Sequence, residues 1–422
     1  MRILISGASI AGPVLAYWLA HYGFRPTVVE RSPTPRKTGG HAVDLFRPAM
    51  DIVERMGVLS RIEAKKTGTE RLTLLREGRH RRIEVDLRRL MYAVSDRHVE
   101  IMRDDLSEIF LDATRDTVEY VFDDSITALA EDADGVDVTF ARGVPRRFDL
   151  VIGADGLHSN VRRLVFGDER RFTHWLGAYL AVMTLPNYLG LKDQLMLFGD
   201  VGRMAGVYSG QQMDDARAVF MFRTPRELGV HHRDVARQKE VVRAAFAGLG
   251  REIPRLLAEL ERTPAFYFDS ITQLRMDTWS RGRVTLVGDA GYSPGPAVGG
   301  STSLAVVGAY VLAGELAAAG GDPVRGFQAY EHELGDYVRR SRIFALNAAR
   351  SLVPRGRFQL WALAQAARMI NHVPPGMIRA LARRNSKGVR LHDSIVLEDY
   401  EQRARTAATT TPRASTLDRS FT

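Results

Sequence analysis

The pattern that most restricts the fold of this chain lies in residues 1–30. A short apolar run, Arg2–Ser6, leads directly into Gly-Ala-Ser-Ile-Ala-Gly at 7–12, an order typical of a buried parallel strand followed by a tight turn. The sequence then predicts a helix over 13–22 and a second apolar strand over Arg25–Glu30. This βαβ unit is the first half of a dinucleotide-binding fold.

The turn departs from the pattern G-x-G-x-x-G, because Ser9 stands where the second glycine belongs. That glycine lets the backbone approach a pyrophosphate, and serine is the smallest replacement that adds a hydroxyl donor. Glu30 follows Gly12 by eighteen residues, at the end of the second strand, where an acidic residue accepts hydrogen bonds from ribose hydroxyls. The residues expected at this site are Gly7, Ser9, Ala11, Gly12, Glu30 and Arg31. The alternative is a tight turn without a ligand and a solvated carboxylate.

Helices and strands alternate after this unit, and the pattern changes in the middle of the chain. Helices are predicted over Arg47–Met56, Asp96–Leu111 and Arg237–Leu260, and strands over Val118–Phe122, Val136–Phe140, Phe148–Gly153 and Arg283–Gly288. From about Thr173 to Arg275 strands and turns dominate, with strands at Ala178–Leu185, Leu195–Phe198, Met204–Tyr208 and Ala218–Phe222. Residues 324–381 are predicted to be helical, and the tail beyond Arg403 to be disordered. We expect an α/β protein with an inserted antiparallel sheet and a helical C-terminal segment.

Three of the predicted strands end in turns of small residues, before Gly7, Asp155 and Asp289. In a parallel sheet the carboxyl ends of such strands share one edge, and open α/β folds bind their ligands at that edge. We therefore expect three segments that are far apart in the sequence to form one site.

Charge and cysteine content limit the partners. The 59 Lys and Arg exceed the 50 Asp and Glu, and a net charge of +9 alone would suit nucleic acid or an anionic surface. However, the densest cluster, Arg76, Arg79, Arg81 and Arg82, flanks a predicted hairpin turn at Glu77–Gly78 without interleaved aromatic residues, so no nucleic-acid partner is expected. The lack of cysteine excludes disulfides, thiolate metal sites and thiol nucleophiles, and it fits a reducing, cytoplasmic compartment. The sequence shows no metal-ligand cluster and does not decide between a monomer and a homodimer.

Two segments have the composition of membrane signals. Met1–Ala20 begins like a secretory signal, but two glycines and a proline interrupt its apolar run. Ala290–Gly314 has no charged residue, but its first half is rich in Gly, Pro and Ser, so that only about Ser303–Leu316 is expected to be helical. A helix of that length is too short to cross a bilayer, and no membrane span is expected.

Two longer motifs accompany the first turn. Residues 149–162 read Asp-Leu-Val-Ile-Gly-Ala-Asp-Gly-Leu-His-Ser-Asn-Val-Arg, and residues 282–292 read Gly-Arg-Val-Thr-Leu-Val-Gly-Asp-Ala-Gly-Tyr. Together, in this order, the three motifs resemble those of the group A flavoprotein monooxygenases, the aromatic hydroxylases related to para-hydroxybenzoate hydroxylase, and within them the tetracycline-inactivating type. The resemblance covers about residues 1–350.

The resemblance implies FAD as the cofactor and NADPH or NADH as the co-substrate. The further residues that it places at the cofactor are Arg103, Asp155, Gly156, Gly288, Asp289, Pro296, Gly299 and Gly300. In the family the turn at Asp155 is implicated in binding both FAD and NAD(P)H, Asp289 bonds the ribityl and pyrophosphate part, and Arg103 leads a helix over the flavin. The glycine-rich stretch that contains Gly299 and Gly300 would present backbone N–H groups to the flavin ring.

The implied domains are a Rossmann-like FAD-binding domain over 1–172 and 276–350, a substrate-binding sheet domain over 173–275, C-terminal helices over 351–402 and a disordered tail over 403–422. In such enzymes NAD(P)H reduces the flavin, oxygen adds to form a C4a-hydroperoxide, and one oxygen atom passes to the substrate. We expect a small, largely apolar substrate of aromatic or polyketide-like type. A reductase or dehydrogenase of the same fold, or a flavin-binding protein without catalysis, is the alternative. A halogenase would need a tryptophan pair, whereas Trp18, Trp175, Trp279 and Trp361 are scattered.

Several residues near the expected ring have no assigned role. Tyr292 stands where the family usually has His, and Ser301 where it has a second Gly. His41 and Asp44 occupy a stretch that passes beside the flavin in relatives, and we expect both to be ordinary loop residues. A base for a phenolic substrate is open among His231, His232, Tyr208 and Tyr267, and nothing in their spacing selects one.

Overall fold

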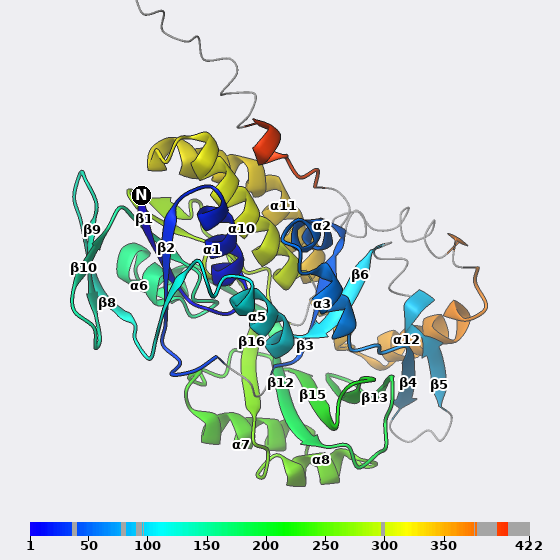
Figure 1. Cartoon of the computed structure of the whole chain (residues 1–422). Coiled ribbons are helices and arrows are strands. Elements are labelled where there is room, and N and C mark those ends of the chain that lie inside the picture. The colour runs from blue at the N-terminus through cyan, green and yellow to red at the C-terminus, as the bar shows by residue number, and fades with distance from the viewer. Residues whose placement is uncertain are drawn as a thin grey trace, which may run out of the picture.

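The structure is a computed structural model that describes residues 1–35, 40–76, 82–89, 95, 97–296, 300–374, 376–377 and 395–403. A six-stranded sheet lies at the centre of the first domain, in the order β17-β18-β11-β1-β2-β7 (Figure 1). Its strands are β1 (Arg2–Ser6), β2 (Arg25–Glu30), β7 (Glu119–Phe122), β11 (Leu150–Gly153), β17 (Ser280–Arg281) and β18 (Val284–Leu286). All neighbours run parallel except β17 and β18. The α/β fold with a Rossmann-like domain is confirmed.

Helix α10 (Ser301–Ala318) lies inside the first domain, packed against α1 (Ala11–His21), α2 (Arg47–Arg55) and α11 (Pro323–Leu352). By length and composition it could cross a membrane, yet 78% of its 18 residues are buried inside the protein. The helix is longer than the predicted Ser303–Leu316. The expectation that it is too short to cross a membrane therefore does not hold for the observed helix. Its apolar composition is explained by burial in the core.

The helix predicted over Asp96–Leu111 is wrong in its first part. Residues His98–Met102 form strand β6, which pairs antiparallel with β3 (Ala42–Phe46), and α5 (Arg103–Asp112) begins only at Arg103. Val99 and Ile101 are buried while the residues between and before them are half-buried. This period of two is that of a strand with one face in the core.

Two other predicted helices are each divided by a turn. In place of Arg237–Leu260 the chain forms α7 (Val235–Phe246) and α8 (Ile253–Glu259), because Gly248 and Arg251 take positive φ values of 76° and 55° between them. The predicted helical stretch 324–381 contains α11 and α12 (Arg357–Ile370), with Pro354 and Gly356 in the break. Residues 378–381 of this stretch, and 404–422 of the predicted tail, lie outside the described residues.

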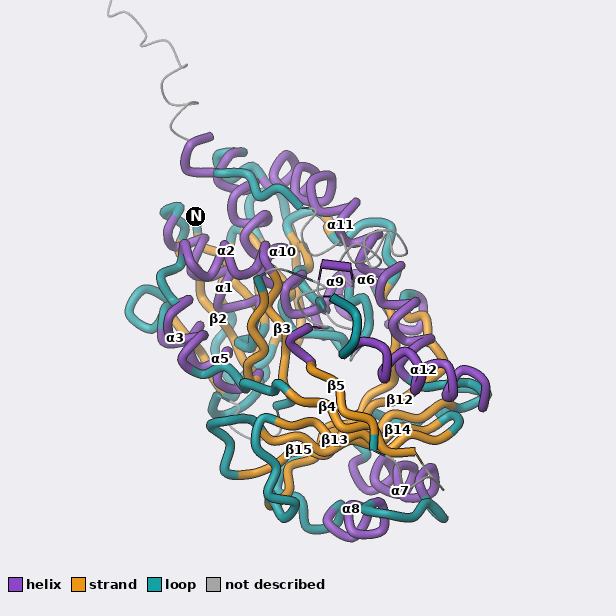
Figure 2. Tube along the Cα trace, turned by 90° about the vertical axis from the view of Figure 1, so that its right-hand side faces the viewer, coloured by secondary structure: helices purple, strands orange, loops and turns teal. Residues whose placement is uncertain are grey.

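A second sheet of seven strands lies beside the first domain, in the order β16-β12-β15-β14-β13-β4-β5 (Figure 2). Five strands come from the middle of the chain: β12 (Thr173–Pro186), β13 (Gln194–Asp200), β14 (Arg203–Ser209), β15 (Asp215–Arg223) and β16 (Phe266–Leu274). The other two, β4 (Arg71–Arg76) and β5 (Ile83–Asp86), form the hairpin predicted around 77–78, whose turn lies outside the described residues. β4 joins the sheet by pairing parallel with β13. Residues outside 173–275 thus extend the sheet, an arrangement that the predicted division did not include.

The two faces of the second sheet pack differently. On one face, Phe220 and Phe268 pack with Phe246 and Leu256 of α7 and α8. On the other face, Leu180, Val182 and Ile271 pack with residues of α11. Figures 1 and 2 show α7 and α8 on the side of the sheet away from the first domain. The second face therefore turns toward the first domain.

The remaining described elements are short. A three-stranded sheet consists of β8 (Ile126–Glu131), β9 (Val136–Phe140) and β10 (Arg146–Phe148), and the short helices are α3 (Leu59–Ala64), α6 (Asn160–Phe166), α9 (Asp289–Tyr292) and the 3-10 turn η1 (Glu169–Arg171). Near the C-terminus Tyr400 packs against α10 at Gly314, where a Cβ atom would lie 2.2 Å from the tyrosine ring.

Candidate cofactor and substrate site

The three turns that were predicted to meet do meet. Strands β18, β11 and β1 are neighbours and run parallel, so the residues that follow them lie along one edge of the sheet. Gly288 shows how close the segments come, because a Cβ atom built on it would lie 3.3 Å from the Cβ atoms of both Ala11 in α1 and Ala305 in α10. The edge therefore brings together the first turns of two helices.

The first turn leaves no room for side chains at its two glycines. Gly7 has a φ of 109°, and a Cβ atom on it would lie 2.5 Å from the carbonyl oxygen of Ala154 in the second turn. A Cβ atom on Gly12 would lie 1.9 Å from the carbonyl oxygen of Gly7. Among the described residues no side chain caps α1 at Ile10. The uncapped N–H groups and the bare backbone suit a phosphate group.

Ser9 and Arg103 lie against each other over this turn. Arg103 Nη2 donates to Ser9 Oγ at 3.0 Å, and Ser107 Oγ donates to the carbonyl oxygen of Ser9 at 3.0 Å. The backbone N–H of Arg103 donates to the carbonyl oxygen of His41 at 3.1 Å. Arg103 is the first residue of α5. Because its guanidinium contacts Ser9 in the first turn, it adds positive charge beside the predicted phosphate site.

Glu30 is turned toward the same loop. Its Oε2 accepts from the backbone N–H of Ala8 and its Oε1 from that of Ser32, both at 2.9 Å. A carboxylate has further acceptor sites on each oxygen, so Glu30 has capacity left for hydroxyl donors beside the first turn. Arg31, the next residue, is exposed.

The Asp155 carboxylate forms its hydrogen bonds within its own loop. It accepts hydrogen bonds from Ser159 Oγ at 2.5 Å and from the backbone N–H groups of Asn160 and Val161 at 2.9 and 3.1 Å, which fixes the start of α6. Burial raises the pKa of Asp155. Gly156 follows with a φ of 81°. The structure thus gives Asp155 a role in shaping the second turn.

Asp289 connects the third turn to α10. Its Oδ1 accepts a hydrogen bond from Ser301 Oγ at 2.6 Å. Ser301, which stands where the family has a glycine, therefore has a hydrogen-bond partner in this carboxylate. Gly288 and Gly300 precede α9 and α10 with φ values of 66° and 85°, and no side chain among the described residues caps either helix. Pro296 lies in the connection between them, and Gly299 lies outside the described residues.

Tyr292, at the position of the family histidine, points into the core. Tyr330 Oη donates to Tyr292 Oη at 2.9 Å, and the Trp279 ring lies 4.6 Å away, centroid to centroid. A Cβ atom on Gly308 of α10 would lie 2.0 Å from the Tyr292 hydroxyl. Tyr292 therefore fills space beneath α10.

The second sheet contributes polar groups from the face that turns toward the first domain. On β15, Ala216, Ala218 and Phe220 are buried toward α7 and α8, whereas Arg217 and Val219 between them are half-buried. Arg217 Nε donates to the carbonyl oxygen of residue 40 at 3.3 Å, and its guanidinium pairs with Asp215. On neighbouring β14, the Tyr208 hydroxyl accepts from the backbone N–H of residue 42 at 2.9 Å.

His41 lies between these two contacts, and its ring lies 5.5 Å from that of Tyr267 on β16. Burial, and then the charge of Arg103, lowers the pKa of His41 to about 4. Burial raises the pKa of Tyr267 well above its usual value, and Asp269, Arg103 and Asp289 act on it as nearby charges. Both side chains are neutral near pH 7. Asp44 is held by His98 Nε2 at 2.7 Å between β3 and β6. The expectation that neither His41 nor Asp44 is catalytic stays a prediction.

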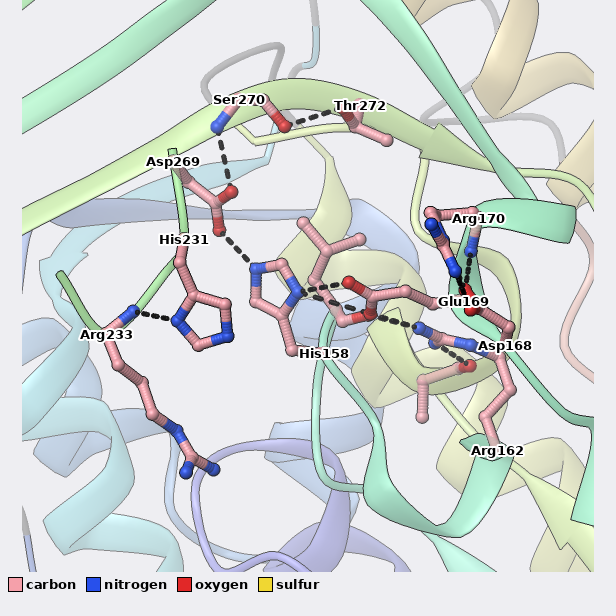
Figure 3. Close-up of polar contacts among 12 residues, drawn as sticks. His158, Arg162, Asp168, Glu169, Arg170, His231, Arg233, Asp269, Ser270 and Thr272 are labelled. Atoms are coloured by element: carbon pink, nitrogen blue, oxygen red, sulfur yellow. Dashed lines mark hydrogen bonds and ion pairs between the residues drawn. The ribbon is translucent and has the colours of Figure 1, made fainter. Parts of the chain in front are cut away.

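A cluster around His158 joins the two domains (Figure 3). His158 Nδ1 lies 3.2 Å from Glu169 Oε1, and its Nε2 lies 3.4 Å from Asp269 Oδ2 on β16. Burial disfavours the charge of His158, but the hydrogen bonds to both carboxylates raise its pKa to about 9. Fully buried Arg162 bonds Glu169 at 3.2 Å and the carbonyl oxygen of Ala290 at 2.8 Å, which links the second and third turns.

The two candidate histidines of the middle region belong to this cluster. The ring of His232 stacks on that of His158 at 4.2 Å, and the ring of His231 stacks on that of His232 at 4.4 Å. Burial, and then the charge of His158, lowers the pKa of His232 to about 4. Sequence reasoning did not select His158 or Arg217. His158 lies within the second motif, which was the only signal for it.

Comparison with known proteins agrees with this geometry. The family of the FAD binding domain matches residues 1–345. A flavin-dependent monooxygenase of Legionella longbeachae is 38% identical over 354 residues, which are 84% of this chain and 90% of the relative. An uncharacterized protein of Mycobacterium tuberculosis is 45% identical over 342 residues, 81% of this chain and 91% of the relative. The crystal structure of tetracycline destructase Tet(55) superposes with a TM-score of 0.79 at 35% identity and covers 94% of this chain and 98% of that one.

The chain therefore belongs to the FAD binding domain family. Within it, the chain is a group A FAD-dependent monooxygenase, and the alternative of a flavin-binding protein without catalysis is not supported.

The residues at the sheet edge fit FAD. The glycines at 7 and 12 form a cradle that any Cβ atom would fill, and two helix starts without side-chain caps face it within the described part of the chain. The carboxylates of Glu30 and Asp289 provide acceptors for sugar and ribityl hydroxyls on either side. The described residues contain no group of three His, Asp or Glu that could hold a metal ion.

Proposed function

We propose that this enzyme consumes NADPH or NADH together with O2 and adds one oxygen atom to a largely apolar, polycyclic substrate of aromatic or polyketide type. The second oxygen atom leaves as water, and the nicotinamide is oxidised to NADP+ or NAD+. We place the substrate on the face of the second sheet that turns toward the first domain.

The composition of that sheet face carries the proposal. Leu195, Leu197 and Val219 are half-buried there, and Leu197 and Val219 pack beside the cluster that includes Ala345 and Ala349 of α11. Arg217 and Tyr208 lie on the same face and provide a few polar groups. An apolar surface with a small number of polar groups is typical of a binding site for a small organic molecule.

The relatives support a polycyclic substrate. Tet(55) and Tet(51), whose structures superpose at 35% and 33% identity, are tetracycline destructases. The polar groups that would meet such a substrate are Tyr208, Arg217 and Tyr267, on three strands of the second sheet, together with the backbone of residues 40–42. These segments are far apart in the sequence, so the substrate site forms only when the chain is folded.

Bound FAD supplies electron transfer and the activation of oxygen, which no side chain of this protein can provide. We assign Glu30 to the adenosine ribose, the first turn with Arg103 to the pyrophosphate, and Asp289 to the ribityl chain. His41 is neutral above about pH 4, so near pH 7 it can accept a hydrogen bond from a phenol or enol hydroxyl. Tyr267 keeps its proton and acts as a donor.

The test is an assay of FAD-loaded protein with a panel of polycyclic phenols and polyketides. We expect substrate to stimulate both NAD(P)H oxidation and oxygen uptake, and mass spectrometry to show a product heavier by one oxygen atom. Substrate reduction without oxygen uptake would instead identify a reductase, and the absence of a yellow, FAD-releasing protein would refute the cofactor assignment.

A further inference from the structure

The positive charge of this chain is concentrated in one segment. Between residues 337 and 392 the sequence has twelve Lys and Arg and no Asp or Glu. The rest of the chain has 47 Lys and Arg against 50 Asp and Glu, a net charge of −3. The excess of +9 is therefore a property of this basic segment, residues 337–392.

Helix α12, within the basic segment, has an apolar outer face. Ala364 and Ala367 are buried against the hairpin of β4 and β5, and Leu360 is buried beside Gly199 of β13. On the opposite side, Phe358, Trp361 and Met369 are 79%, 50% and 64% exposed. At 3.6 residues per turn these three lie along one stripe with Ala362 and Gln365 and without a charged residue.

This apolar face lies at the periphery of the molecule. Figures 1 and 2 show α12 next to the β4–β5 hairpin, and in Figure 2 the helix lies at the edge of the molecule. The rings of Phe358 and Trp361 stack on each other at 5.8 Å, centroid to centroid. Large apolar side chains grouped on an exposed helix face mark an interaction site.

Arginines without acidic partners border the apolar face. Arg355 and Arg357 are exposed at the start of α12, and Arg350 is exposed at the end of α11. Within the described part of the chain none of the three forms an ion pair. Arg339 and Arg340, at the start of the basic segment, instead both pair with Asp336, the residue before it. The charge next to α12 is therefore uncompensated.

We propose that α12 docks on a lipid bilayer that contains anionic lipids. Phe358, Trp361 and Met369 enter the headgroup region, and Arg350, Arg355 and Arg357 contact lipid phosphates. An amphipathic helix with aromatic residues on one face and arginines at its border binds membranes in this way, lying in the plane of the interface. This inference is independent of the proposed substrate.

Charge and chemistry favour a membrane over two other partners. A second copy packed on the same face would bring the uncompensated arginines of both copies together, and like charges repel. Nucleic acid is contacted mainly by hydrogen-bond donors to phosphates, whereas the outermost residues of α12 are apolar. Anionic lipid satisfies both the arginines and the apolar face.

The experiment uses the full-length, FAD-loaded protein and two kinds of vesicle, phosphatidylcholine alone and phosphatidylcholine with phosphatidylglycerol. We expect the protein to sediment with the anionic vesicles only, and binding to weaken as salt is added. Trp361 is the most exposed of the four tryptophans, because Trp18 and Trp279 are buried, Trp175 is half-buried and Trp361 is 50% exposed. Anionic vesicles should shift the tryptophan emission to the blue, and W361F should remove that shift while binding remains.

Two double variants test the two parts of the surface. F358S/W361S should abolish sedimentation with vesicles. R355Q/R357Q should weaken binding about fivefold for each arginine removed at low salt. R226Q/R262Q removes the same charge from exposed arginines that have no ion pair in the described structure, and it should bind like the wild type. All three should retain FAD, which the yellow absorbance of the purified proteins verifies.

Three results would overturn the inference: no binding of the wild type to anionic vesicles, an equal loss of binding in R226Q/R262Q and R355Q/R357Q, or an unchanged emission of Trp361. Dimerisation that F358S/W361S reverses would identify a second copy as the occupant. Tight binding to duplex DNA that needs Phe358 and Trp361 would identify nucleic acid.

Discussion

Replacing Asp289 by Ala tests how the three turns hold FAD. The Asp289 carboxylate follows β18, lies where the first turns of α1 and α10 come together, and already accepts one hydrogen bond, from Ser301 Oγ at 2.6 Å. Its second oxygen has no partner among the described residues, so it can accept from a ribityl hydroxyl. A hydrogen bond to a charged group contributes about 1.5–3 kcal/mol. The variant should therefore bind FAD roughly 10- to 100-fold more weakly.

The contact with Ser301 requires a control, because Asp289→Ala also removes that bond. Ser301→Ala loses the same hydrogen bond but keeps the carboxylate, and it should lower the stability of the apo-protein by about 1 kcal/mol with little effect on FAD affinity. Asp289→Asn keeps a carbonyl acceptor and should lie between the wild type and the alanine variant. The FAD dissociation constant and the melting temperature of the apo-protein are measured side by side. The assignment is wrong if Asp289→Ala binds FAD like the wild type, or if Ser301→Ala loses as much affinity as Asp289→Ala.

Three further predictions concern single residues. Glu30→Ala should weaken FAD binding more than it slows the reaction, because Glu30 lies beside the first turn and away from His41 and Tyr267; equal losses, measured by titration and single-turnover kinetics, would contradict this role. Gly12→Ala places a Cβ atom 1.9 Å from the Gly7 oxygen and should cost about 1–3 kcal/mol in thermal unfolding, whereas Gly335→Ala, which meets nothing within 4 Å in α11, should be neutral or stabilising. The stability that charged His158 contributes is fully present below its unfolded pKa of about 6.5 and is lost as pH rises through about 9. His158→Gln should therefore be less stable than the wild type by up to about 3 kcal/mol at pH 6, and the difference should shrink by pH 10; a pH-independent difference in chemical denaturation would exclude the charged state.

The sequence was sufficient to predict that the three turns meet at one edge of the first sheet. Each of its three turns is a continuous string that follows an apolar strand, and the geometry of parallel sheets then requires that the strings meet. The close approach at Gly288 confirms this reasoning. The role of Asp155 could not be read in this way, because whether a carboxylate points toward a ligand or caps its own helix depends on one side-chain rotation.

The substrate half could not be predicted, because its residues meet only through strand pairing between distant segments. The parallel pairing of β4 with β13 joins residues 71–76 to residues 194–199, and no local pattern encodes that register. The strand at 98–102 was mistaken for a helix since it continues directly into α5. Arg217 was missed for a similar reason: its position on the open face follows from the alternation of β15 only once the face covered by α7 and α8 is known.

The departures from the family pattern at Tyr292 and Ser301 are each matched by a neighbour in this chain. Tyr292 needs the space that Gly308 leaves and finds a hydroxyl partner in Tyr330, and Ser301 finds a carboxylate in Asp289. The hydroxyl groups of Tyr292 and Ser301 both have hydrogen-bond partners, so neither side chain opposes the fold by burying its own polar group unpaired. A histidine at 292 would have to share the same small volume beneath α10 with Tyr330 and Trp279. The residue at 292 is therefore set by core packing in this chain.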